Sequence, residues 1–395
     1  MGKIIDWDKS IIPACDVPLE VYEEILKNTG DMDKIGGYKI GLYLMLLEGL
    51  KDVEIPDNAL YNHRSGATDI PDMGKNMLSV IKDYPEIKGI ILTPLSGPAT
   101  QEKWTEVAKE YGKLVFIEPV LDMKTFLESD GGYITDDSIS RIIDLGLKQE
   151  VDGFILPYTE LGDKLAEKLK DKATKVLRRE KGQLDSEFIE FTAYDVIPNG
   201  LSRIVEVTEK HTDKPIIYDH QKAGTDIPDM GEKFAKVCKN AGVDAIILFP
   251  QSGPETEKAW IEAAKEEDLG IIVGGLMTHP KYVRSEGGYL ADEAVMRMYL
   301  NGADLGVTDF VVPGNKPDDI KRIKETLEER GISPTFYAPG FVAQGGEISD
   351  AAKVAGKNWH AIVGRGIYES ENIRQAALEY TSNLIFNSQA TKPER

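Results

Sequence analysis

Short apolar runs alternate with amphipathic segments along most of the chain. Runs of Ile, Leu, Val and Phe are typical of strands that are buried on both faces of a parallel sheet. Such runs occupy residues 89–92, 114–117, 153–156, 245–248, 270–273, 310–312, 335–337 and 361–363. Apolar residues recur at helical spacing in residues 19–29, 101–111, 136–147, 160–170 and 230–241. The alternation predicts an α/β fold with a parallel sheet.

The sequence contains this pattern of strands and helices twice. Ser-Gly-Pro, a tryptophan and Gly-Gly-Tyr follow one another at residues 96–98, 104 and 131–133, and again at 252–254, 260 and 287–289. This repeat predicts an internal duplication. The copies are unequal, because only the first begins with two clear strands and only the second ends with two further ones.

We therefore predict a first copy over residues 1–175 and a second over 176–395. The charged residues 172–187 between them are expected to form an exposed linker. Two ways of sharing the strands stay open. One is a pair of barrels of which the first is incomplete. The other is a single barrel built from residues 1–55 and about 195–395, with the middle as a duplicated insertion.

The most informative stretch is a loop that occurs in both copies. Residues 61–74 are YNHRSGATDIPDMG and residues 218–231 are YDHQKAGTDIPDMG, so TDIPDMG recurs without change. The second loop follows a predicted strand and precedes a predicted helix. Barrel enzymes carry their chemistry at this position.

The two loops differ in their charges. Asp219 and Lys222 of the second copy are replaced by Asn62 and Ser65 in the first. Carboxylates on both sides of a lysine, here Asp219 and Asp226, can hold its charge and make it a proton donor. A salt-bridged surface loop is the alternative, but it gives no reason for such a selective loss of charge in one copy.

Two further charged residues belong to the first predicted strands. Asp16 ends the strand at residues 11–16, and Lys39 lies inside the strand at residues 37–41. A lysine in an apolar strand is uncommon without a charged partner. A strand-edge lysine that reaches solvent is the alternative for Lys39.

Glycine-rich loops follow the last two predicted strands. Residues 339–346 are PGFVAQGG, and residues 363–368 are VGRGIY. Glycines let the backbone approach an oxyanion, Arg365 can clamp a phosphate with two hydrogen bonds, and Gln344 can add a neutral donor. Barrels commonly bind phosphate at the loops after strands seven and eight, which predicts a phosphate site here.

Composition narrows the class of protein. The 395 residues are 41% apolar, which suits a globular protein, and the net charge of −20 argues against nucleic acid and anionic membranes as partners. Cys15 and Cys238 provide no disulfide framework. With neither a signal peptide nor a long apolar stretch, the chain is expected to be cytoplasmic.

Together these motifs resemble the orotidine 5′-monophosphate decarboxylase superfamily, as a tandem-duplicated member of the archaeal or bacterial kind. The similar features are Asp16, Lys39 in Tyr-Lys-Ile-Gly, the Asp219 to Pro228 loop, Met277-Thr278-His279-Pro280, Asp304-Leu305-Gly306-Val307 and the two glycine-rich loops. Residues 215–380 are similar nearly throughout, and residues 1–175 as a weaker copy. The resemblance implies a (β/α)8 TIM-type barrel, here internally duplicated with its first half incomplete.

The resemblance also implies roles for single residues. Lys222 is expected to donate a proton to C6 of the pyrimidine, Asp219 to orient Lys222 and crowd the substrate carboxylate, and Lys39 to complete the charged array. Asp16 is expected to bind the ribose and Thr278 to meet the pyrimidine edge.

The phosphate and the partner subunit complete the implied site. Gln344, Gly364 and Arg365 are expected to hold the phosphate. In the family a second aspartate comes from the partner subunit of a dimer. Two copies in one chain can supply it internally as a pseudo-dimer, so either Asp69 or Asp226 is expected to take that role. Whether the chain also forms a homo-oligomer is left open.

One departure concerns spacing. The family loop has the form Asp-x-Lys-x-x-Asp, whereas this loop is Asp219-x-x-Lys222-x-x-x-Asp226, so His220 stands at the spacing from Lys222 that an aspartate would occupy. The longer spacing puts the placement of Asp219 in question.

The resulting hypothesis is decarboxylation of orotidine 5′-monophosphate to UMP, in pyrimidine biosynthesis, with no cofactor and no metal. The five histidines are scattered, so the sequence offers no metal-binding set of histidine and cysteine. The alternatives are a Mg²⁺-dependent sugar-phosphate lyase similar to hexulose-phosphate synthase, and a non-catalytic protein that binds a phosphate ligand.

Overall fold

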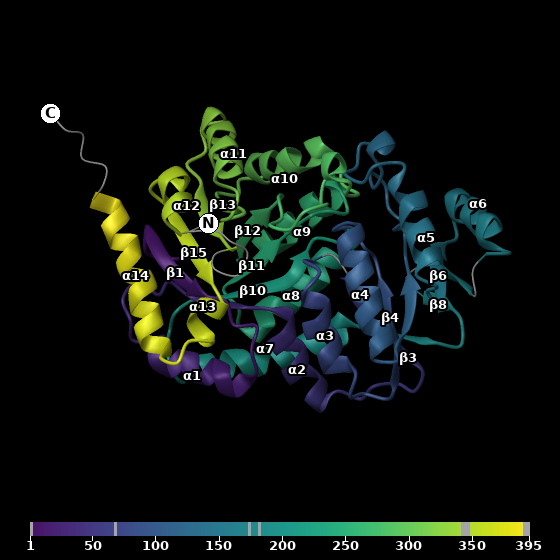
Figure 1. The fold of residues 1–395 in the computed structure, drawn as a ribbon, viewed down its shortest axis with the longest axis horizontal. Coiled ribbons are helices and arrows are strands. Elements are labelled where there is room, and N and C mark those ends of the chain that lie inside the picture. Colours follow the sequence, from purple (N-terminus) through teal and green to yellow (C-terminus); the bar gives the residue numbers. More distant parts are fainter. Residues whose placement is uncertain (1–2, 67–68, 173–174, 181–182, 341–347, 390–395) are drawn as a thin grey trace.

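A computed structural model describes residues 3–66, 69–172, 175–180, 183–340 and 348–389. Two sheets, each surrounded by helices, make up these residues. Figure 1 shows the first and last parts of the chain, purple and yellow, together in one body and the blue residues of the first copy in another.

Eight parallel strands form the larger sheet. Backbone bridges from Ile11 to Ile35 and from Ala14 to Lys39 join its two edge strands and close it. The strand order is β1 (Lys9–Pro13), β15 (Trp359–Val363), β14 (Thr335–Ala338), β13 (Asp309–Val311), β12 (Gly270–Gly274), β11 (Ala245–Leu248), β10 (Ile216–Ala223) and β2 (Tyr38–Ile40). This is the (β/α)8 barrel that the sequence predicts.

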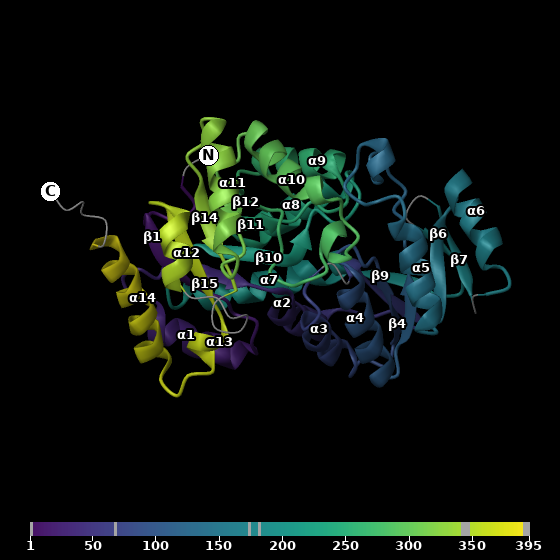
Figure 2. The ribbon, with the colours of Figure 1, turned by 45° about the horizontal axis from the view of Figure 1, so that its top comes forward.

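Helices cover the outside of this barrel, as the two views in Figures 1 and 2 show. They are α1 (Leu19–Thr29), α2 (Leu42–Gly49), α7 (Ala193–Glu209), α8 (Met230–Ala241), α9 (Pro254–Glu266), α10 (Asp292–Asp304), α11 (Pro317–Glu329), α12 (Ile348–Ala355), α13 (Arg365–Tyr368) and α14 (Ile373–Gln389). Nowhere in the described ranges does a helix combine the length and the apolar character needed to cross a bilayer.

The smaller sheet is built from the first copy and has seven strands. Their order is β8 (Gln183–Asp185), β7 (Val176–Glu180), β6 (Gly153–Pro157), β5 (Leu114–Ile117), β4 (Ile87–Leu92), β3 (Ala59–Gly66) and β9 (Ile189–Thr192). Its helices are α3 (Met73–Ile81), α4 (Pro98–Glu110), α5 (Ser138–Lys148) and α6 (Glu160–Leu169). The strands are parallel except for β8, which runs antiparallel to β7. The internal duplication, with an incomplete first half, is therefore confirmed.

The division of the strands corrects the boundary expected at residue 175. Strands β1 and β2 pair with β15 and β10, so the first residues of the chain belong to the barrel of the second copy. Strands β7 to β9 lie beyond residue 175 but pair with the first copy. The arrangement follows the other alternative, one barrel from both ends of the chain with a duplicated insertion. The apolar runs could not decide this, because each of them fits either sheet.

Residues 172–187 are not the exposed linker that the charges predicted. Strands β7 and β8 form a hairpin there, and the charged side chains are partly used inside the sheet. Arg179 on β7 forms ion pairs with Glu118 at 2.7 Å and with Glu190 at 2.5 Å. Charges that are paired within a fold give the same sequence signal as solvated ones.

The two copies contact each other through equivalent elements. Gly97 and Gly253 begin helices α4 and α9 with φ angles of 109° and 138°. A Cβ atom at Gly97 would lie 2.2 Å from the carbonyl oxygen of Lys281, and one at Gly253 would lie 2.3 Å from that of Thr125. Each copy thus places its helix start against the backbone of the other, which explains why Ser-Gly-Pro occurs in both.

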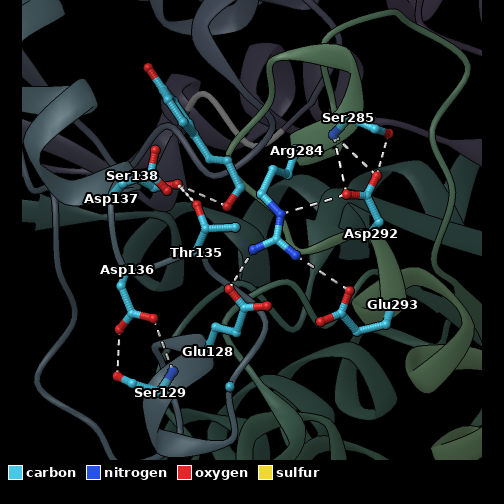
Figure 3. Close-up of polar contacts among 12 residues, drawn as sticks. Glu128, Ser129, Thr135, Asp136, Asp137, Ser138, Arg284, Ser285, Asp292 and Glu293 are labelled. Atoms are coloured by element: carbon cyan, nitrogen blue, oxygen red, sulfur yellow. Dashed lines mark hydrogen bonds and ion pairs between the residues drawn. The ribbon is translucent and has the colours of Figure 1, made fainter.

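Polar loop residues add to this contact (Figure 3). Arg284 of the second copy lies 2.7 Å from Glu128 of the first and 3.6 Å from Glu293. Ser138 donates a hydrogen bond of 3.0 Å to the carbonyl oxygen of Tyr289. Because the charged groups are partly exposed, their ion pairs contribute little to stability and mainly fix the orientation of the copies.

Candidate active site

A cavity of about 610 Å³ lies at the carboxyl ends of the barrel strands. All eight strands, or the loops directly after them, contribute residues to its lining. One wall comes from the first copy, through the start of helix α3 and the residues just before it. Parallel barrel strands bring their carboxyl ends to one face, and this is the face that barrel enzymes use for catalysis.

A buried group of charges lines this cavity. Lys39 on β2 places its Nζ atom 3.1 Å from Oδ2 of Asp219 and 3.5 Å from Oδ2 of Asp16. The Lys39 and Asp219 side chains are only 9% and 7% exposed. The strand pairings explain the meeting of these residues, since β2 lies between β1, which precedes Asp16, and β10, which carries Asp219. Lys39 is therefore a buried, paired lysine rather than one that reaches solvent.

The pKa shifts follow from burial and from the surrounding charges. Burial lowers the pKa of Lys39, but the carboxylates of Asp16 and Asp219 outweigh it, so this pKa lies above its ordinary value. Burial raises the pKa of Asp16, and Asp219 and Asp69 raise it further against the effect of Lys39. Lys39 is thus held as an ammonium ion, while the acids around it repel one another.

The two candidate aspartates of the repeated loops lie in different surroundings. Asp69 of the first copy lines the cavity, and its carboxylate is close enough to influence the pKa values of both Lys39 and Asp16. Asp226 of the second copy is buried outside the cavity lining. Its Oδ2 atom accepts a hydrogen bond of 3.3 Å from the hydroxyl group of Tyr194. The geometry therefore brings Asp69, and not Asp226, to the charged group.

The residues expected to bind substrate are placed as far as the structure describes them. Thr278, Gly364 and Arg365 line the cavity, where Thr278 follows β12 and the other two follow β15. Gln344 lies outside the described residues. The backbone of Lys222 belongs to β10, but its side chain lies outside the described part of the structure.

Sequence reasoning missed much of the wall between the copies. Met73, Lys75 and Asn76 of helix α3 line the cavity, and so does the apolar side chain of Phe249 in the barrel. Met73 lies in the repeated TDIPDMG motif, and Lys75 and Asn76 follow it directly, so the repeat was the one feature of the sequence that pointed to these residues. That signal shows a repeat, but not that the first copy faces the cavity of the second.

The arrangement can bind an anion beside a dense group of charges. Arg365 offers a partner for phosphate, and the carboxylates of Asp16, Asp69 and Asp219 surround the ammonium group of Lys39. Within the described ranges, His, Cys, Asp and Glu side chains form no group of three or more with the geometry of a metal site.

About half of the chain is similar in sequence to known proteins. A sequence model described as "Orotidine 5'-phosphate decarboxylase / HUMPS family" matches residues 188–380. This range runs from β9 into the first part of α14, so it leaves out β1 and also β2, which carries Lys39.

Similar proteins are found among archaea. Orotidine 5′-phosphate decarboxylase of Methanococcus maripaludis is 33% identical over 186 residues, which are 47% of this chain and 79% of that protein. The protein of the same name from Methanocaldococcus jannaschii is 29% identical, over 54% of this chain and 93% of that protein. A crystal structure of the latter decarboxylase, complexed with inhibitor BMP, covers 49% of this chain and 85% of that one, with 29% identity and a TM-score of 0.42.

Proposed function

Because the chain belongs to the orotidine 5′-phosphate decarboxylase / HUMPS family, we propose that it converts orotidine 5′-monophosphate into UMP and CO2 without a cofactor. The observation that carries this proposal is the buried group of Lys39, Asp16 and Asp219, which shares one cavity with Asp69 of the other copy. The family includes members with other reactions, so the substrate is inferred from the site.

The charge balance of the cavity supports a decarboxylation. Asp16, Asp69 and Asp219 lie close enough to the ammonium group of Lys39 to raise its pKa. A substrate carboxylate placed beside Asp69 and Asp219 is repelled in the ground state. The repulsion is relieved as the carboxylate leaves as neutral CO2, and relief of this kind lowers the barrier.

The proton is proposed to come from Lys222. The bond between C6 and the carboxylate breaks, and its electron pair remains on C6. The ammonium group of Lys222 then donates its proton to C6, which yields UMP, and the lysine regains a proton from solvent. Carboxylates that line the same cavity, such as Asp69 and Asp219, favour a charged lysine, which is the state that the transfer requires.

The remaining residues are proposed to hold the nucleotide. Arg365 and Gly364 bind the phosphate together with Gln344, because Arg365 can form a charge-assisted pair with it. Thr278 contacts the pyrimidine and Asp16 the ribose. Both line the same cavity as Arg365.

Asp69 is proposed as the second aspartate of the reaction. It is supplied by the first copy, in the way that the family uses a partner subunit. The support is its place in the cavity lining and its influence on the pKa of Lys39. The chain then contains one complete site, and its substrate is a free nucleotide. The proposed location is the cytoplasm, whose reducing conditions suit the buried free thiols of Cys15 and Cys238.

Release of CO2 from orotidine 5′-monophosphate by the purified full-length chain tests the proposal. We expect stoichiometric UMP, turnover that survives excess chelator, and loss of turnover in Lys222→Ala. Metal-dependent cleavage of a ketose phosphate, with no turnover of the nucleotide, would instead support the sugar-phosphate lyase. Tight binding of UMP without any release of CO2 would support the non-catalytic alternative.

A further inference from the structure

Both repeated loops contain an irregularity at the same place. The pairing of β10 with β11 shifts in register between Asp219 and Ala223, and the pairing of β3 with β4 shifts between Asn62 and Gly66. The extra residues of a bulge redirect the side chains that follow it, and bulges often lie next to active sites. The unusual spacing of the loop is thus a feature of both copies, including the one that lost its charges.

The two bulges meet through a pair of histidines. The rings of His63 and His220 lie with their centroids 4.4 Å apart and their planes inclined by 37°. They are 3% and 2% exposed. Each is the first residue of its bulge, directly after Asn62 or Asp219. The contact therefore joins the beginning of one irregular segment to the beginning of the other.

A tyrosine fixes each imidazole. The hydroxyl group of Tyr61 lies 2.9 Å from Nδ1 of His63, and that of Tyr218 lies 2.7 Å from Nδ1 of His220. Both tyrosines are buried and stand two positions earlier on the same strand. Because side chains alternate along a strand, Tyr218 and His220 share one side of β10 and Asp219 faces the cavity on the other.

The surroundings of the pair are apolar. The His220 ring lies 5.1 Å from that of Phe234 on α8, and the Tyr61 ring lies 6.0 Å from that of Phe191 on β9. Burial lowers the pKa of His63 well below its ordinary value and that of His220 to about 3, so both rings are neutral near pH 7. Two neutral rings can stack, whereas two imidazolium ions would repel each other.

We propose that His63 and His220 are positioning residues that hold the two bulged loops in register, so that Asp69 from one copy and Lys222 from the other serve the same site. Asp69 follows His63 by six residues and Lys222 follows His220 by two. Neither histidine lines the cavity, so neither acts on the substrate directly. The inference rests on the proposed function for its effect on turnover, but the coupling of the loops is independent of it.

Substitution of His63 is the sharper test, because it lies in the copy without the charged loop. We expect His63→Leu to lower kcat at least about tenfold, since a displacement of about 1 Å can cost 10²-fold in rate. KM and the affinity for UMP should stay within about twofold. His63→Asn, which keeps a planar polar group near Tyr61, should recover much of the loss.

His360 offers a matched control. It is a buried histidine of the barrel, 1% exposed, and its Nδ1 atom lies 2.7 Å from the hydroxyl group of Ser10. In the sequence it is distant from both repeated loops, and it does not line the cavity. His360→Leu should lower the melting temperature and leave kcat within about twofold. Equal losses of stability with unchanged kcat in both leucine variants would overturn the inference.

Hydrogen–deuterium exchange measures the coupling of the two loops without depending on enzymatic activity. His63→Leu should speed exchange in residues 219–226 of the second copy as well as in its own loop, and His360→Leu should do neither. Faster exchange confined to the mutated loop would overturn the coupling. If the wild-type chain releases no CO2 but the loops are coupled in exchange, the proposed reaction fails and the positioning contact stands.

Discussion

At the carboxyl ends of the two sheets, β10 with β2 and β3 with β9 pair in the same register but carry different charges. In the barrel, Lys39 on β2 faces Asp219 on β10. At the equivalent register of the smaller sheet, Glu190 replaces the lysine and Asn62 replaces the aspartate, and their side chains lie 2.7 Å apart. The cation of the smaller sheet is Arg179, which forms an ion pair with Glu190.

This difference separates the requirements of the fold from those of the site. In the smaller sheet Arg179 lies between Glu118 and Glu190, so its charge is compensated within the sheet. None of these three residues lines the cavity. At the barrel, Asp16, Asp219 and Lys39 share a cavity with Asp69 of the first copy. A fold that only has to be stable compensates its buried charges, whereas a site keeps them available to a ligand.

The largest effects on stability should come from removing Lys39 from the barrel or Arg179 from the smaller sheet, and only the first should also lower turnover. Lys39→Met leaves two buried carboxylates without their partner, which should destabilise the chain by about 3–5 kcal/mol. It should also lower turnover at least about 10²–10³-fold, as expected for loss of an electrostatic group at a reacting centre. Arg179→Met should cost similar stability and leave kcat within about twofold. Urea unfolding and steady-state kinetics on both variants measure the two effects.

The comparison would break if Arg179→Met lowered turnover as strongly as Lys39→Met at a temperature where both variants are folded. The smaller sheet would then take part in the reaction through more than Asp69.

The next effect concerns the two aspartates of the repeated loops. Asp69→Ala should lower kcat about 10²-fold, because Asp69 faces the charged group across the cavity. Asp226→Ala should mainly lower stability, because its carboxylate is bonded to Tyr194 outside the cavity. Kinetics with orotidine 5′-monophosphate decide between them, and the reverse order would assign the role to Asp226.

The sequence predicted these aspartates but could not choose between them. The verbatim repeat identified both loops, and the lost charges in Asn62 and Ser65 identified the degenerate copy. Which loop faces the cavity depends on β1 joining β15 and β2 joining β10, pairings between segments that lie far apart in the sequence. Such long-range pairing leaves no local signal.

The wrong prediction of a linker over residues 172–187 has a related cause. Strand β7 contains Arg178, Arg179 and Glu180, and the apolar pattern that marks a buried strand is absent there. Its charges are satisfied by ion pairs that form only in the folded chain, such as that of Arg178 with Asp163 at 2.7 Å. Pattern analysis detects apolar burial, so a strand stabilised by paired charges is read as a linker.

A smaller effect is expected at Arg365, the proposed phosphate ligand, which has no counterpart in the described part of the smaller sheet. There β7 is followed by the antiparallel strand β8, whereas β15 of the barrel is followed by helix α13, which begins at Arg365. Arg365→Ala should weaken UMP binding by about 1.5–3 kcal/mol and leave the affinity for uridine unchanged. Calorimetry should also give one equivalent of UMP per chain. Two equal sites would show that the first copy binds nucleotide as well.

The smallest effect on turnover should come from a pair of residues that differ between the copies at their contact. Glu257 of the second copy is 1% exposed, and its Oε2 atom accepts a hydrogen bond of 2.6 Å from the hydroxyl group of Tyr133. The equivalent residue of the first copy is Gln101, which accepts a hydrogen bond of 3.0 Å from Tyr289 and donates one of 3.0 Å to the carbonyl group of Ile142. One copy thus buries an acid where the other buries its neutral amide.

This difference predicts a pH dependence of stability. Burial raises the pKa of Glu257 from 4.5 to about 8, so the folded chain keeps the acid protonated where the unfolded chain ionises it. The stability that protonation provides is complete below pH 4.5 and is lost as the pH rises through about 8.

Glu257→Gln should remove this loss of stability at high pH. At pH 8.5 the variant should gain on the order of 2–4 kcal/mol relative to its difference from wild type at pH 4.5, with kcat unchanged. Gln101→Glu is the matched reversal, and it should introduce a second loss of stability over the same pH range. Chemical unfolding at both pH values measures all three chains. Parallel pH profiles for wild type and Glu257→Gln would show that Glu257 ionises in the folded chain as readily as in water, and that the two copies meet through a contact that is less dry than its burial indicates.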